Sequence, residues 1–251
     1  TTADYNTAVG RYCMGVNTTG ERNTAMAPFA LDGNTTGNYN VAMGYAALSD
    51  SSTSSHNVGV GYMSLYLNTT GYDNTAVGSQ ALYSNTTGAF NTGIGRKAFY
   101  SVTTGSNNTA VGENAAPNLT TGGDNSCNGV GAFAALTTGS NNSALGRAAG
   151  GSLTTGSNNT FIGHDAGTSN GPGGAIETDS NTVVIGDNNI GTYYVRNSWT
   201  VTSDKRDKAD ITDFNIGLSW IEKLRPVTYR WDMRTNYTDG KSDGSKKEDQ
   251  L

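Results

Sequence analysis

The sequence predicts an all-β fold for residues 1–190, a parallel β-solenoid whose stacked coils each add one strand to a sheet. Three observations predict it: an asparagine recurs every 17 residues, a short alternating segment follows each asparagine, and glycines close the turns. A 17-residue coil cannot bury an apolar face alone, so it must stack on its neighbours. The recurring asparagines are Asn6, Asn23, Asn40, Asn57, Asn74, Asn91, Asn108, Asn125, Asn142 and Asn159.

The repeat reads Asn-Thr-Ala-Val-Gly-x-x-Ala-Leu-x-x-Asn-Thr-Thr-Gly-x-x, and we number its positions from the first asparagine. Positions two and four share one face of a strand, and position three points the other way. Position four is apolar (Val9 in the first coil), and we expect it to fill the coil interior. Position three is small (Ala8), and we expect it to allow another surface to approach closely. A second apolar stripe follows at positions eight and nine.

The polar residues of the repeat predict its turns. Glycines at positions five and fifteen, such as Gly10 and Gly20, are expected to adopt positive φ. The asparagine column is expected to form a ladder of side-chain amides that satisfies backbone groups of the turns. Two irregularities interrupt the pattern. The strand near Cys127–Gly131 comes two residues late and predicts a bulge, and a loop over Thr168–Ser180 precedes a last coil at Asn181–Gly186.

Charge divides the chain into parts. Residues 203–251 hold 10 acidic and 10 basic side chains, whereas residues 1–202 hold 11 and 6. We therefore expect a repeat stalk over 1–190, a β neck over 191–202 and a different domain over 203–251. No basic stripe is present to neutralise phosphates, so nucleic acid is not an expected partner. No apolar run is long enough to predict insertion into a membrane.

Few side chains of the repeats suggest ligand chemistry. His56 and His164 fall in different repeat positions, so we expect neither a metal site nor a cofactor. Cys13 and Cys127 lie 114 residues apart, too far along the rod for a disulfide, and both replace small residues of other coils. A column of tyrosines shares one position and is expected to stack between coils, with a sugar-contact surface as the alternative. Its members are Tyr66, Tyr83 and Tyr100.

These repeats resemble the head repeats of trimeric autotransporter adhesins and the similar Asn-Thr-Ala-Val-Gly repeats of phage tail fibres. The resemblance covers residues 1–190, although this repeat is longer than the usual adhesin one. It implies a left-handed β-roll in which three chains surround one axis. The small face at position three agrees with chains that pack side by side, so we expect a homotrimer.

The segment Ser203-Asp204-Lys205-Arg206-Asp207-Lys208 resembles the start of the intramolecular chaperone of endosialidases, phage tail fibres and tail spikes. The downstream run Leu224–Trp231 strengthens the resemblance. The resemblance implies that Ser203 is a nucleophile, that Lys208 is its general base, and that the Thr202–Ser203 bond is cleaved once. Asp204 and Arg206 complete the motif. The alternative is that Ser203 and Asp204 only cap a helix. The family's domain normally continues further, so 203–251 is expected to be its first part, a short α+β fragment.

The sequence thus favours a structural and adhesive trimeric fibre of a phage tail, which attaches the virion to a glycan receptor on a bacterial surface. Its enzymatic activity would be at most a single-turnover Ser-Lys self-cleavage. One alternative is the head of a trimeric adhesin on a bacterial cell surface. Another is a polysaccharide-degrading tail spike, which needs a carboxylate pair in a groove. Acids of the repeats are scattered, among them Glu21, Asp32, Asp73, Glu113 and Asp124.

Overall fold

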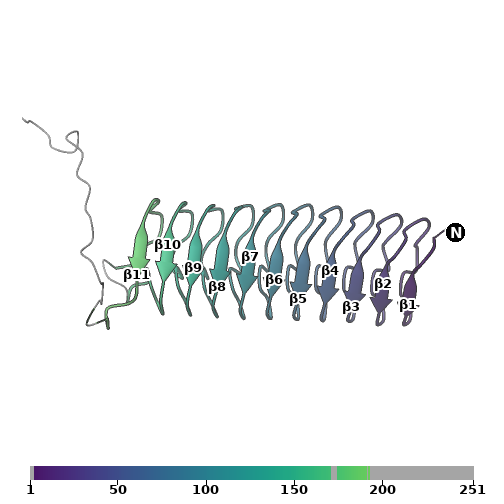
Figure 1. Ribbon diagram of the computed structural model, residues 1–251, viewed down its shortest axis with the longest axis horizontal. Coiled ribbons are helices and arrows are strands. Elements are labelled where there is room, and N and C mark those ends of the chain that lie inside the picture. Colours follow the sequence, from purple (N-terminus) through teal and green to yellow (C-terminus); the bar gives the residue numbers. More distant parts are fainter. Residues whose placement is uncertain (1–2, 171–173, 191, 193–251) are drawn as a thin grey trace, which may run out of the picture. The chain divides into compact units, whose positions relative to one another are not determined.

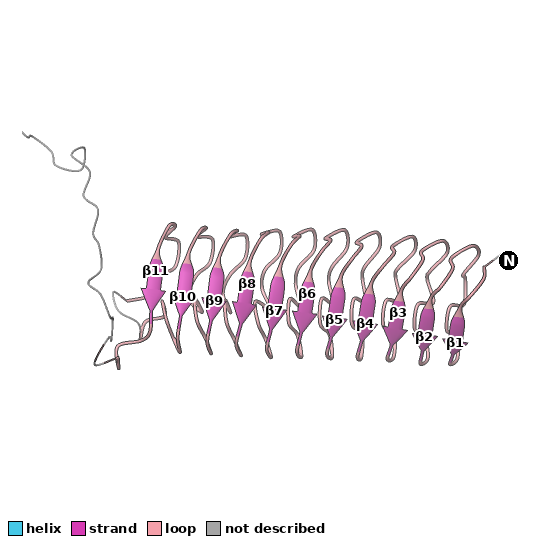
Figure 2. Cartoon of the chain, in the orientation of Figure 1, coloured by secondary structure: helices cyan, strands magenta, loops and turns pink. Residues whose placement is uncertain are grey.

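The computed structural model describes residues 3–170, 174–190 and 192, and within them the chain forms one parallel β-solenoid. Eleven strands of three residues follow one another along the sheet in sequence order (Figure 1). Strands and loops alone make up this described part, as Figure 2 shows. The strands are β1 (Thr7–Val9), β2 (Thr24–Met26), β3 (Val41–Met43), β4 (Val58–Val60), β5 (Thr75–Val77), β6 (Thr92–Ile94), β7 (Thr109–Val111), β8 (Ser126–Asn128), β9 (Ser143–Leu145), β10 (Thr160–Ile162) and β11 (Val183–Ile185).

The register confirms the 17-residue repeat. Ala8 pairs with Ala25, and each following strand adds one repeat, so equal positions form columns along the sheet. Only the last step is longer, because Phe161 of β10 pairs with Val184 of β11. The predicted parallel solenoid is therefore confirmed. None of the described residues belongs to a helix long and apolar enough to cross a bilayer.

The core lies on the opposite side of the strand from our expectation. Position three is inside: Ala25 and Ala42 have no exposed surface. Position four points out of the coil, and Val9 and Leu145 are 55% and 56% exposed. The leucine at position nine explains the reversal, since a Cβ built on Gly59 at position three would already lie 3.3 Å from Cγ of Leu48. Only a hydrogen or a methyl group fits beside such a leucine.

The pattern near Cys127 contains no bulge. Strand β8 pairs residue for residue with both neighbours, so Val111, Asn128 and Leu145 share one column. We predicted a late strand because Asn128 stood at a position that we expected to be interior. Since position four faces outward, an asparagine is tolerated there and the repeat continues unbroken.

The two glycine columns have different causes. Position five needs positive φ, as predicted: Gly10 has φ of 139° and Gly44 has 139°. Position fifteen does not adopt positive φ, which corrects our expectation. There the next coil passes too closely for a side chain, because a Cβ on Gly37 would overlap the carbonyl oxygen of Ser54.

At the end of the predicted loop before the last coil, the chain rejoins the columns that equal repeat positions form in the earlier coils. Within this loop the carbonyl of Glu177 accepts a hydrogen bond from the backbone N–H of Thr154 at 2.7 Å, and that of Asp179 accepts one from Nδ2 of Asn159 at 2.8 Å. Thr182, not Asn181, then takes the place of the column asparagine, since its N–H donates to Oδ1 of Asn159 at 2.9 Å. The last coil is thus shifted by one residue from its predicted start.

Candidate functional site: the outward face of the sheet

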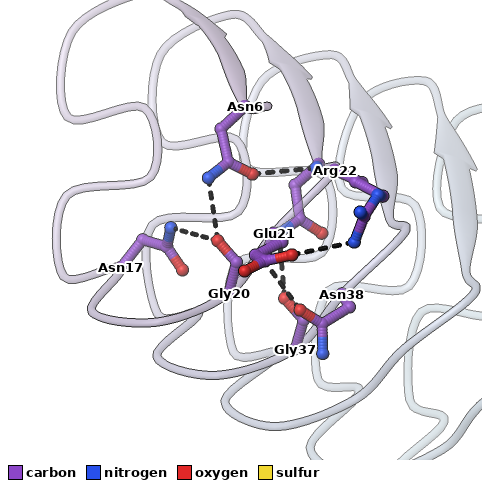
Figure 3. A network of polar contacts seen from close by, with 8 residues as sticks. Asn6, Asn17, Gly20, Glu21, Arg22, Gly37 and Asn38 are labelled. Atoms are coloured by element: carbon purple, nitrogen blue, oxygen red, sulfur yellow. Dashed lines mark hydrogen bonds and ion pairs between the residues drawn. The ribbon is translucent and has the colours of Figure 1, made fainter. Parts of the chain in front are cut away.

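The predicted asparagine ladder fixes each coil against the next. At its start Nδ2 of Asn6 donates to the carbonyl of Gly20 at 2.8 Å, and Oδ1 accepts the N–H of Asn23 at 2.8 Å (Figure 3). The same pair of bonds recurs in later coils, for example from Asn40 to the carbonyl of Ser54 and to the N–H of Asn57. The asparagines from Asn23 onward are almost fully buried, so water competes little for the hydrogen bonds of their amides. The strands are therefore held in a regular array.

A second, shorter asparagine column at position twelve was not anticipated as a ladder. Nδ2 of Asn34 donates to Oδ1 of Asn17 at 2.9 Å, and Nδ2 of Asn85 donates to Oδ1 of Asn68 at 2.7 Å. The column then becomes apolar at Val102, and three buried leucines continue it. Oδ1 of Asn85 consequently has no hydrogen-bond donor among the described residues. The recurrence of asparagine at position twelve in the sequence could have indicated this ladder.

Positions two and four of each strand form what we call the outward face. Position four supplies its apolar column, in which Met26, Ile94 and Ile162 are 41%, 40% and 41% exposed. Threonine, serine and valine occupy position two, and neither position holds a charged residue in any of the eleven strands. At about 4.8 Å per strand the face is roughly 50 Å long. Continuous exposed apolar surface of this kind marks an interaction site.

The outward face is hollowed across β8, β9 and β10. The hollow has a volume of about 340 Å³, and Asn128 and Leu145 of the column line it with Ser126, Ser143 and Thr160. Asn128 is the polar member of the column, and its amide makes no hydrogen bond within the described part of the chain. Chemically, this place offers donors and acceptors within an otherwise apolar surface.

The tyrosine column stacks as predicted. The ring centroids of Tyr66 and Tyr83 lie 5.3 Å apart, and those of Tyr83 and Tyr100 lie 5.1 Å apart, with interplanar angles of 13° and 11°. Because these rings cover one another's faces, the middle ring presents its edge and hydroxyl. Sugar rings bind to open aromatic faces, so the sugar-contact alternative gains no support from this geometry.

A second aromatic cluster lies at position seventeen, where sequence reasoning did not place one. His56 stacks on Tyr39 at 5.0 Å, and the guanidinium of Arg22 lies between Tyr5 and Tyr39, at 5.2 and 5.4 Å from their ring centroids. Arg22 also pairs with Glu21 at 2.8 Å (Figure 3). This alternation of aromatic and cationic groups stabilises neighbouring turns through cation–π contacts.

Both cysteines are free, as predicted. Cys127 stands at position three, where other coils have alanine or glycine, and burial raises the pKa of its thiol to about 12. Burial also raises the pKa of Cys13, whose thiol lies 3.2 Å from the carbonyl oxygen of Ala25. Neither thiol has the lowered pKa that a nucleophilic cysteine requires.

The predicted cleavage residues lie outside the described residues. They are Thr202, Ser203, Asp204, Arg206 and Lys208. The Ser-Lys dyad therefore stays a prediction.

Comparison with known families finds a similarity in the C-terminal part. Residues 203–249 match the chaperone of endosialidase family. The match begins at Ser203, the first residue of the predicted motif, and leaves the solenoid uncovered. No curated protein and no solved structure matches the chain. The chain thus combines a β-solenoid with a segment that is similar to the chaperone of endosialidase family.

Proposed function

We propose that the solenoid is the shaft of a trimeric phage tail fibre that attaches the virion to a bacterial surface. In this fibre three copies pack their outward faces around one axis. The observation that carries the proposal is the uncharged column of position four along the eleven strands, apolar in ten of them, joined in sequence to the chaperone segment. The bacterial receptor, for which a glycan is the candidate, is contacted by other surfaces of the rod.

The spacing of the outward face favours an identical partner. Apolar side chains repeat at the strand spacing of about 4.8 Å along the whole rod. Only a partner with the same repeat stays in contact with every coil, and another copy of this chain has that repeat. The net charge of the chain is −5, yet the outward face carries no charge. Copies therefore meet there without bringing like charges together.

The chaperone segment supplies the order of assembly in this proposal. The chaperone brings three chains together, the solenoid forms, and Lys208 becomes buried and neutral, because burial disfavours its charged form. Lys208 then accepts the hydroxyl proton of Ser203, and Oγ attacks the carbonyl carbon of Thr202. The Thr202–Ser203 amide bond breaks as an ester forms and the proton passes to the leaving nitrogen. Water hydrolyses the ester, which leaves a Thr202 carboxylate and a free Ser203 amine.

Loss of the chaperone would give the fibre kinetic stability. Because every coil of the solenoid resembles the next, the coils specify the register between chains poorly. A trimer contact outside the solenoid therefore helps the three chains to align correctly. Once that contact is removed, an unfolded chain cannot reassemble by the same route. Resistance to unfolding then depends on the barrier rather than on equilibrium.

Two measurements test the proposed function. Analytical ultracentrifugation of the full protein is expected to give a trimer, and Val77→Glu on the outward face is expected to dissociate it. Thr87→Glu, an exposed residue of the same coil that lies off this face, is the matched control and should leave the trimer intact. A monomeric native protein would exclude the trimeric fibre.

Cleavage is tested separately by intact mass under denaturing conditions. The native protein is expected to split between Thr202 and Ser203, while Ser203→Ala and Lys208→Met stay whole. If the native chain also stays whole although it is trimeric, the chaperone segment acts in assembly alone and the dyad has no catalytic role.

A further inference from the structure

The apolar column of the outward face contains a single polar residue. In ten of the eleven strands position four is valine, methionine, isoleucine or leucine, and in β8 it is Asn128. Asn128 lies directly between Val111 and Leu145 in the sheet. It is exposed, and its amide has no partner within the described residues. An amide with free hydrogen-bonding groups in an apolar interface site requires a partner from outside its own chain.

The surroundings of Asn128 suit an amide partner. Position two carries Ser126 in the same strand and Ser143 in the next, and both serines line the hollow beside Asn128. On the N-terminal side of Asn128 the column continues with Val111, and on its C-terminal side with Leu145 and Ile162, which also line the hollow. A polar group that reaches position four at the level of β8 therefore finds an amide, whereas one coil away position four offers only Val111 or Leu145.

We propose that Asn128 fixes the axial register of the three chains. This inference rests on the proposed trimer. When the outward faces meet in register, three Asn128 amides lie at one level and hydrogen-bond one another. A shift by one coil, about 4.8 Å, leaves the apolar column matched everywhere else. It places each amide against Val111 or Leu145 of a neighbour, where its groups are buried without partners.

The free energies involved decide the register. Exchange of one apolar side chain for another in the column changes the contacts little, so slipped and unslipped rods would otherwise be close in stability. Leaving a polar group buried without a partner costs more than an ordinary hydrogen bond contributes. One polar layer in an apolar interface also fixes register in coiled coils, at some expense of stability. Asn128 is the residue of the apolar column that can discriminate in this way.

A cysteine cross-linking experiment tests the proposal. The background protein carries Cys13→Ala and Cys127→Ala. Chains with Val60→Cys and chains with Ile94→Cys, each with a different mass tag, are produced together and oxidised. These positions are two coils apart, about 9.6 Å along the rod, which exceeds the reach of a disulfide in register. A slip of one coil brings the two positions to about 4.8 Å, within that reach, so a disulfide between the two kinds of chain reports a slipped trimer. Val77→Cys alone reports that the outward faces meet.

The expected result separates the native column from its variants. With Asn128 present, Val77→Cys chains cross-link and the mixed pair does not. Asn128→Val is expected to raise the mixed disulfide by about tenfold or more, as unpaired amides no longer penalise the slip. Asn128→Val combined with Val111→Asn moves the polar layer by one coil and is expected to restore a single register.

Failure of the two proposals can be distinguished. If Asn128→Val is trimeric and still gives no mixed disulfide, Asn128 does not set the register, although the trimer stands. If the double variant slips as much as Asn128→Val, the position of the amide has no effect, and the inference is also overturned. A monomer in ultracentrifugation, with no cross-link through Val77→Cys, overturns the proposed function and this inference with it.

Discussion

Phe161 occupies the interior space that a position-nine side chain fills in other coils, and it does so because Gly167 stands at position nine of its own coil. A Cβ added to Gly167 would overlap the ring of Phe161. In earlier coils the large residue is at position nine (Leu31, Leu48) and the small one is at position three. The tenth coil exchanges the two sizes, and Phe161 instead packs edge to face against Phe133 at 5.9 Å.

This exchange predicts a rescue. Phe161→Ala should lower the free energy of unfolding by about 3–5 kcal/mol, since it leaves a cavity in a buried site. Adding Gly167→Leu to that variant should recover a large part of the loss, because leucine occupies the same left-handed conformation at Leu31 and Leu48, both at φ of 53°. Chemical denaturation of the single and double variants measures it. Gly167→Leu alone is the control and should destabilise by overlap; a double variant less stable than Phe161→Ala would contradict the exchange.

Ala27 is the exception in the position-five glycine column. Its φ is 131°, a backbone conformation that residues with a Cβ rarely adopt, whereas the corresponding glycines are unstrained there. Ala27→Gly should raise the free energy of unfolding by about 1 kcal/mol, as relief of strain exceeds the added chain entropy. Ala25→Gly, in the same coil but at extended position three, should lower it by a similar amount. Thermal or urea unfolding compares the two, and a loss of stability in both would show that Ala27 is not strained.

The stack of coils could be predicted from sequence because the period alone requires it. The asparagine spacing gave the register, and the buried ladder from Asn23 onward follows from the need to satisfy turn backbone groups. The alternation Thr-Ala-Val also showed which residues share a face of the strand. It could not show which face is inside, because the outward face of this rod is apolar too.

The size of a side chain, rather than its hydrophobicity, indicates which face of the strand is inside. Val9, at position four, is expected in the core because it is apolar. The structure instead buries position three, where the methyl group of Ala25 fits beside the leucine of position nine. The same error turned Asn128 into a supposed irregularity. The assumption that apolar residues lie inside fails for a rod with an apolar exterior column. It fails at the surface that we assign to assembly. The motif at Ser203 was recognisable, since it depends on local sequence rather than on packing.

The end of the second asparagine ladder predicts a stabilising substitution. Oδ1 of Asn85 is buried without a donor, and Val102 of the next coil stands where the ladder would supply one. Val102→Thr has the same shape and adds a hydroxyl that can donate to Asn85, so it should raise the free energy of unfolding by about 1 kcal/mol. In an ordinary apolar site the same change destabilises. Val102→Ala is the control for lost methyl contacts, and denaturant unfolding in which threonine is as harmful as alanine would contradict the prediction.

Cys127 predicts how stability depends on alkaline pH. Burial raises the pKa of its thiol from 9.0 to about 12 in the folded chain. Below pH 9 the thiol is mostly protonated whether the chain is folded or not, so it has little effect on the free energy of unfolding. Between pH 9 and 12 the unfolded chain loses this proton and the folded chain keeps it, so unfolding becomes more favourable as pH rises. At about 1.36 kcal/mol per pKa unit, the loss approaches about 4 kcal/mol at pH 12.

Cys127→Ala isolates this contribution from the ionisation of tyrosine and lysine. Alanine is the usual residue at position three, so the variant should keep the fold. Unfolding free energies of both proteins, measured by denaturant titration from pH 7 to 11, should run parallel below pH 9 and diverge above it, with the native protein losing more. Parallel curves over the whole range would mean that the thiol ionises in the folded chain as freely as in the unfolded one. Position three would then be open to water, against the packing of Leu48 over Gly59.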